Sequence, residues 1–248
     1  MKKGIWALFL VMLLSGEALA RDVTVFAAAS LTDAFLAIKP AFETQHPGTK
    51  VLINFASSGS LFRQLEKGAQ ADVYASANPK WMDKAEAARM IVPSTRTTFA
   101  RNSLVLAVPK ANPARITSLE DLQAPRVAMI SLGNPKHVPA GQYARDALLK
   151  KDLWESLQAK FIFGETVRQV LDYLKRGEVD CGFVYGTDAQ KGGSRITVIE
   201  EIPLDQPVTY PIALLDQAVE PELGHALLDF ITGPQGLRIL QASGFKKP

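Results

Sequence analysis

The chain has 248 residues, in which 28 Lys and Arg side chains nearly balance 25 Asp and Glu side chains. This balance, without a basic stripe along the sequence, argues against a nucleic-acid-binding protein. The single cysteine, Cys181, rules out an internal disulfide, and its apolar surroundings favour a buried strand residue over a nucleophile.

The first twenty residues have the pattern of a secretory signal peptide. Lys2 and Lys3 precede an apolar stretch over 5–14, and the small residues at 18 and 20 form a cleavage site. The apolar stretch is too short to span a bilayer, which takes about 20 residues. We therefore expect residues 1–20 to be removed and the exported protein to begin at Arg21.

The first half of the remaining chain alternates short apolar runs with helical patterns. Strands are predicted over 23–27, 50–55 and 72–76, and each is followed by a helix, over 33–42, over 61–67 and through Trp81 and Met82. This order of elements predicts a mostly parallel sheet with helices on both faces.

The second half opens a similar series at residue 103. Strands are predicted over 103–108, 126–130, 180–185, 196–199 and 208–214, and helices over 118–122, 141–149, 167–175, 222–230 and 234–242. Ser118 is the predicted cap of the first of these helices. The sequence therefore predicts an α/β fold with two lobes of similar design.

Four helices of these series start with a run of small or hydroxyl residues, over 27–32, 55–60, 138–141 and 164–168. A helix start presents free backbone N–H groups and the positive end of the helix dipole, which together suit an anion. In open α/β sheets, ligands lie beyond the carboxyl ends of the strands. If the lobes face each other, all four starts can converge on one cleft.

These phrases resemble those of the ModA family, the periplasmic molybdate-binding proteins of molybdate and tungstate ABC importers. The resemblance covers nearly all of the chain after the signal peptide and is carried by residues 25–32, 55–58, 71–77, 80–83, 102–105, 137–141, 184–189, 210–213, 233–235 and 244–245. It implies a type II periplasmic binding protein, with one lobe formed by 21–99 plus 209–248, the other by 100–208, and a ligand cleft between them.

The resemblance also implies the function. The protein would be a periplasmic monomer that does no chemistry, needs no cofactor, binds molybdate or tungstate, and delivers it to the permease and ATPase of an ABC transporter. The residues that match the family's oxyanion site are Ser30, Ser58, Ala140, Val167 and Tyr185. The roles of Ser57, Ser60 and Lys136 are left open.

These residue types suit a tetrahedral dianion that carries no proton near neutral pH. Hydroxyls and backbone N–H groups can all donate, and a hydrogen bond to an ionised acceptor is roughly twice as strong as a neutral one. None of the five is acidic, so a protonated anion such as hydrogen phosphate finds no acceptor. Burying a cation is costly, so we expect no charged side chain on the anion. Arg63 and Arg168 follow binding phrases and are the residues most able to contradict this.

Other interpretations remain open. Ser30 and Ser58 could be ordinary helix caps, and the same scaffold could bind sulfate, another small anion or an organic carboxylate. An exported enzyme would need a nucleophile beside a base, but the chain has no G-x-S-x-G sequence. The three histidines at 46, 137 and 225 are widely spaced, so a site for a bare metal ion is not expected.

Overall fold

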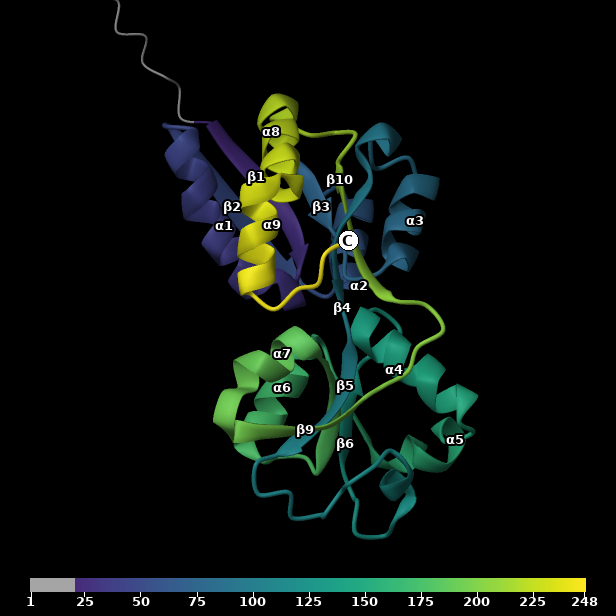
Figure 1. Cartoon of the computed structure of the whole chain (residues 1–248). Coiled ribbons are helices and arrows are strands. Elements are labelled where there is room, and N and C mark those ends of the chain that lie inside the picture. The colour runs from purple at the N-terminus through teal and green to yellow at the C-terminus, as the bar shows by residue number, and fades with distance from the viewer. Residues whose placement is uncertain (1–20) are drawn as a thin grey trace, which may run out of the picture.

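Two five-stranded sheets form two lobes, joined by two stretches of chain that run from one lobe to the other (Figure 1). The computed structural model describes residues 21–248, and the signal peptide predicted over 1–20 lies outside this range. The sheet of the first lobe has the order β2-β1-β3-β10-β4, and that of the second lobe has the order β7-β6-β8-β5-β9. In each sheet only the fourth strand, β10 or β5, opposes the direction of the other four. The expected mostly parallel sheets are confirmed.

The first lobe combines the N-terminal third of the chain with its C-terminal end. Its elements are β1 (Arg21–Ala28), α1 (Thr32–Gln45), β2 (Thr49–Ala56), α2 (Ser58–Glu66), β3 (Val73–Ala75), α3 (Pro79–Ala87), β4 (Thr97–Asn102), β10 (Val208–Leu214), α8 (Pro221–Thr232) and α9 (Pro234–Ala242). A short 3₁₀ helix, η1 (Ala29–Leu31), connects β1 to α1.

The second lobe is one continuous stretch of chain. It contains β5 (Leu104–Pro109), the 3₁₀ helix η3 (Glu120–Gln123), β6 (Ile130–Gly133), α4 (Pro139–Lys150), α5 (Trp154–Leu157), β7 (Phe161–Gly164), α6 (Val167–Arg176), β8 (Cys181–Tyr185), α7 (Gly186–Gly192) and β9 (Ile196–Glu201). Cys181 is buried on β8, as expected from its apolar neighbours.

Alternating side chains give each sheet two buried faces. On β1, Val23 and Val25 belong to the core that contains Phe35 of α1, whereas Phe26 belongs to the core that contains Trp81 of α3. Successive side chains of a strand point to opposite faces, so an apolar strand with helices on both sides buries both sets.

The chain passes between the lobes twice, from Asn102 to Leu104 and over 202–207. The lobe boundaries expected from the sequence lie near these two passages, although β4 runs on to Asn102. The division into 21–99 plus 209–248 and 100–208 stays a prediction. No helix within residues 21–248 is long and apolar enough to cross a membrane.

Two local predictions need correction in the second lobe. The strand predicted over 126–130 starts only at Ile130, because the Asp180 carboxylate accepts the N–H groups of Ala128 and Met129 before the strand begins. Ser118 does not cap the following turn. Asp121 instead accepts hydrogen bonds from the backbone N–H groups of Thr117 and Ser118.

Candidate functional site

All five residues predicted to bind an anion line one small cavity between the lobes. The lining residues are Ala28, Ala29, Ser30, Ser57, Ser58, Ala77, Val138, Pro139, Ala140, Val167 and Tyr185. They come from the segments that follow β1, β2 and β3 in the first lobe and β6 and β7 in the second, and from the end of β8. The convergence expected from the sequence is thus present, and every lining residue is uncharged.

Helix starts supply backbone donors to this cavity. Ser58 is the first residue of α2, Val167 is the first residue of α6, and Ala140 is the second residue of α4. The first four N–H groups of a helix have no partner within it, and they carry its positive partial charge. Neither Ser30 nor Ser58 occupies an N-cap position, so the alternative that they are helix caps is excluded.

A close backbone approach fixes the start of α4. A Cβ atom on Gly141 would lie 1.7 Å from the carbonyl oxygen of Gly133, the last residue of β6. The contact is possible only because Gly141 has no side chain. It holds the neighbouring Ala140 against the end of the strand.

The Ser30 hydroxyl lies at the end of a buried hydrogen-bond relay. Tyr210 donates to Ser30 Oγ across 3.2 Å, and Asn102 Nδ2 donates to the Tyr210 hydroxyl across 3.2 Å. The orientation of the Asn102 amide is set by its Oδ1, which accepts from the Ser103 N–H. Because Ser30 Oγ accepts from Tyr210, its own proton is left to donate into the cavity.

The Ser58 hydroxyl is arranged in the same way. The Ala77 N–H donates to Ser58 Oγ across 3.0 Å, which leaves the serine proton free to donate. The Tyr185 hydroxyl of the second lobe donates to the Ala77 carbonyl oxygen across 3.4 Å, at the same wall of the cavity. Both serine oxygens are therefore occupied as acceptors by protein donors.

Burial keeps the tyrosines protonated. It raises the pKa of Tyr185 and of Tyr210 well above the ordinary value for a phenol. Both hydroxyls thus stay donors near neutral pH. The cavity presents hydroxyl and N–H protons and no carboxylate, which suits a fully ionised anion.

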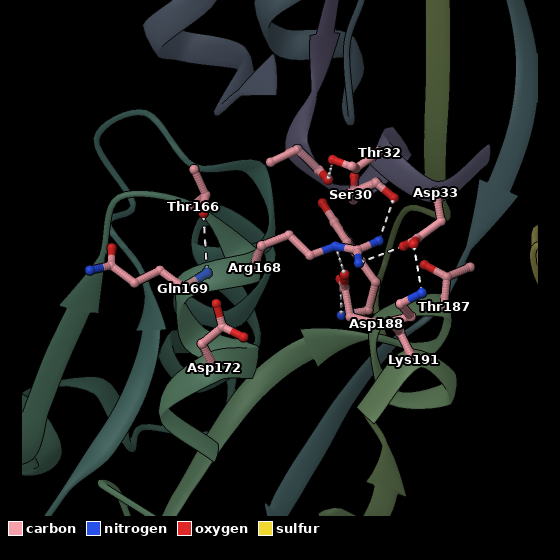
Figure 2. Close-up of polar contacts among 12 residues, drawn as sticks. Ser30, Thr32, Asp33, Thr166, Arg168, Gln169, Asp172, Thr187, Asp188 and Lys191 are labelled. Atoms are coloured by element: carbon pink, nitrogen blue, oxygen red, sulfur yellow. Dashed lines mark hydrogen bonds and ion pairs between the residues drawn. The ribbon is translucent and has the colours of Figure 1, made fainter. Parts of the chain in front are cut away.

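The two arginines named as possible ligands lie elsewhere. Arg168 is not among the cavity residues, and its guanidinium contacts Asp33, Asp188 and the Ser30 carbonyl oxygen (Figure 2). Arg63 donates to Ser60 Oγ at the surface. The side chain of Lys136 is exposed and outside the cavity.

Ser57 and His137 bring the lobes together beside the cavity. Ser57 Oγ lies 3.0 Å from His137 Nδ1 and 2.8 Å from Ser60 Oγ, and the Gly59 N–H donates to the His137 carbonyl oxygen. The roles left open for Ser57 and Ser60 thus include this interlobe network.

The sequence predicts only some of the residues that shape the site. Asn102 and Tyr210 lie inside phrases that carry the family resemblance, yet no local pattern indicates that they orient Ser30 from positions far along the chain. Ala77 acts through its backbone, so its side chain gives no sign of the contact. Among residues 21–248, no group of three or more His, Cys, Asp or Glu side chains could hold a metal ion.

The known proteins that this chain resembles are bacterial solute-binding proteins. The family model described as bacterial extracellular solute-binding protein matches residues 23–246. The chain is 39% identical to the molybdate-binding protein ModA of Escherichia coli K12 over 250 residues, covering 93% of this chain and 92% of that protein. It is 38% identical to the Haemophilus influenzae protein of the same name, over 78% of each chain.

The fold has a counterpart among solved structures. The periplasmic molybdate-binding protein of Azotobacter vinelandii superposes with a TM-score of 0.79 at 22% identity, covering 91% of this chain and 99% of that one. At this identity the likeness concerns the fold, and it agrees with two α/β lobes about a cleft.

Proposed function

Because the chain belongs to the bacterial extracellular solute-binding proteins and, within them, to the ModA family, we propose that it captures molybdate in the cavity between its lobes for uptake into the cell. The observation that carries the proposal is the neutral, donor-only lining formed by Ser30, Ser58, Ala140, Val167 and Tyr185. We propose these five residues as the ligands of the anion.

The donors act in two sets. The hydroxyls of Ser30 and Ser58 have protons free to point at the anion, and the Tyr185 hydroxyl joins them by turning its proton from the Ala77 carbonyl oxygen to the anion. The backbone N–H groups of Ala140 and Val167 add the partial charge of two helix starts. These dipoles are fixed by the fold before the ligand arrives, so little free energy is lost in ordering them. Tungstate has the same shape and charge as molybdate and is expected to bind in the same place.

The lobes then close on the anion by a hinge motion at the two passages between them. The closed protein delivers its cargo to the permease and ATPase of an ABC transporter, and it acts in the periplasm as a monomer that catalyses no reaction. The predicted signal peptide supports export. Its relatives in Escherichia coli and Haemophilus influenzae are molybdate-binding proteins, which supports molybdate as the cargo.

Calorimetric titration of residues 21–248 with molybdate, tungstate, sulfate and phosphate tests the proposal. Tight one-to-one binding of molybdate and tungstate, with little heat from sulfate and phosphate, is the expected result. Equal binding of sulfate would make the protein a general carrier of tetrahedral dianions. Heat from none of the four would overturn the proposal and direct the search to organic anions.

A further inference from the structure

Arg168 is the centre of a four-charge cluster between the lobes, next to the anion cavity but outside its lining (Figure 2). We propose that it is a positioning residue that fastens the closed lobes together and holds the anion ligands in place, without touching the anion. This inference rests on the proposed function, since it concerns the closure of the same site.

Within its own lobe, Arg168 is linked to two candidate ligand residues, Val167 and Tyr185. It directly follows Val167 in α6, and its Nε lies 2.7 Å from Oδ1 of Asp188, which is fully buried in α7. The other carboxylate oxygen of Asp188 accepts from the Tyr185 N–H at 3.3 Å. One buried ion pair therefore connects the segments that carry Val167 and Tyr185.

The other face of the guanidinium reaches the first lobe. Nη1 lies 2.6 Å from Oδ2 of Asp33, in the first turn of α1, and Nη2 donates to the Ser30 carbonyl oxygen across 3.3 Å. The second oxygen of Asp33 is 2.8 Å from Nζ of Lys191 in α7. Asp33 of the first lobe therefore forms ion pairs with both Arg168 and Lys191 of the second lobe. Arg168 also holds the backbone of Ser30 through its carbonyl oxygen.

The charges of the cluster cancel. Arg168 and Lys191 are balanced by Asp33 and Asp188, so the cluster adds no net positive charge beside the cavity. The cluster then contributes by holding the two lobes together and not by attracting the anion. The contacts to Asp33 and Ser30 join different lobes, so separating the lobes breaks them, whereas the contact to Asp188 stays within the second lobe.

Changing Asp33→Asn separates this role from simple attraction of an anion. Removing one negative charge would tighten anion binding if the cluster acted only through its field. If the cluster fastens the lobes, the same change lowers the population of the closed form and weakens apparent affinity, mainly through faster release. The two explanations predict opposite signs.

A matched control exists in the described part of the chain. Glu201 of β9 pairs with Lys246 at 3.6 Å, also between lobes, and both side chains are 61% exposed. Glu201→Gln removes the same charge from an exposed interlobe pair that does not touch the site. Asp33→Glu keeps the carboxylate and serves as the conservative variant.

The measurements are molybdate release by stopped flow, affinity by calorimetry, and the radius of gyration by small-angle scattering with and without molybdate. We expect Asp33→Asn to release molybdate about ten-fold faster and to compact less on binding. Asp33→Glu should lie nearer to the wild type, and Glu201→Gln should match it. Unchanged or tighter binding by a folded Asp33→Asn protein overturns this inference while leaving the proposed function intact. A wild type that binds no molybdate overturns both.

Discussion

The Tyr210 hydroxyl donates to Oγ of Ser30 and thereby decides which way the serine proton points. Tyr210→Phe removes this donor and leaves Ser30 free to turn its proton away from the anion. We expect molybdate affinity to fall by about 1 kcal/mol, roughly five-fold, because a single hydrogen bond in a buried relay is lost. Calorimetry measures the change, and Tyr173→Phe on α6 is the control. Wild-type affinity in Tyr210→Phe would show that Ser30 needs no relay.

The two serine hydroxyls are expected to contribute separately. Ser30→Ala and Ser58→Ala each remove one donor to a charged acceptor, and each should weaken molybdate binding by about 1–3 kcal/mol. Titration of both single variants and the double variant checks this. Near-normal binding by the double variant would contradict the assignment of the site.

Gly141 is predicted to tolerate no side chain. In Gly141→Ala the new methyl group meets the Gly133 carbonyl oxygen at 1.7 Å, and backbone cannot give way as a side chain can. We expect a loss of about 1–3 kcal/mol in the free energy of unfolding, together with weaker binding, because Ala140 moves with the helix start. Thermal unfolding and calorimetry measure both effects. Arg145→Ala, on the exposed side of the same helix, should leave both unchanged.

His137 should make stability depend on pH. Burial lowers the pKa of His137 below its ordinary value of 6.5; Glu165 acts in the opposite direction and Arg63 in the same one. The unfolded chain therefore takes up the proton at a higher pH than the folded protein, so this contribution to stability is complete above pH 6.5 and is lost as the pH falls below it. Melting temperatures from about pH 8 to pH 5 should fall more for the wild type than for His137→Gln. Parallel curves would show that His137 does not titrate differently in the two states.

The sequence identifies elements well where one rule of physical chemistry dominates. Both faces of the central strands are buried, so the apolar runs at β1, β5 and β8 are unmistakable. β4 was missed because it is an edge strand with three exposed residues, and its sequence mixes Thr, Arg and Asn with Phe. β7, an edge strand of the other sheet, was missed although its sequence is apolar, because it has only four residues and two of them are exposed.

Local sequence patterns could not predict contacts between segments that lie far apart in the chain. The delayed start of β6 depends on Asp180, which lies 51 residues from Met129 in sequence. The Arg168 cluster likewise joins α1, α6 and α7. The sequence marked Arg168 as a residue able to enter the site, but the two carboxylates that hold it away could be found only from the fold.

The position of β10 between β3 and β4 has a consequence for how the protein is assembled. A chain that emerges N-terminus first from a translocation channel presents β1 to β4 early, yet the gap between β3 and β4 is filled only when residues 208–214 arrive. The second lobe needs no later segment for its sheet, since all five of its strands lie within 104–201. The second lobe can therefore complete its sheet while the first lobe still lacks β10. Truncation near the C-terminus would consequently disrupt the first lobe, although that lobe contains the N-terminal strands.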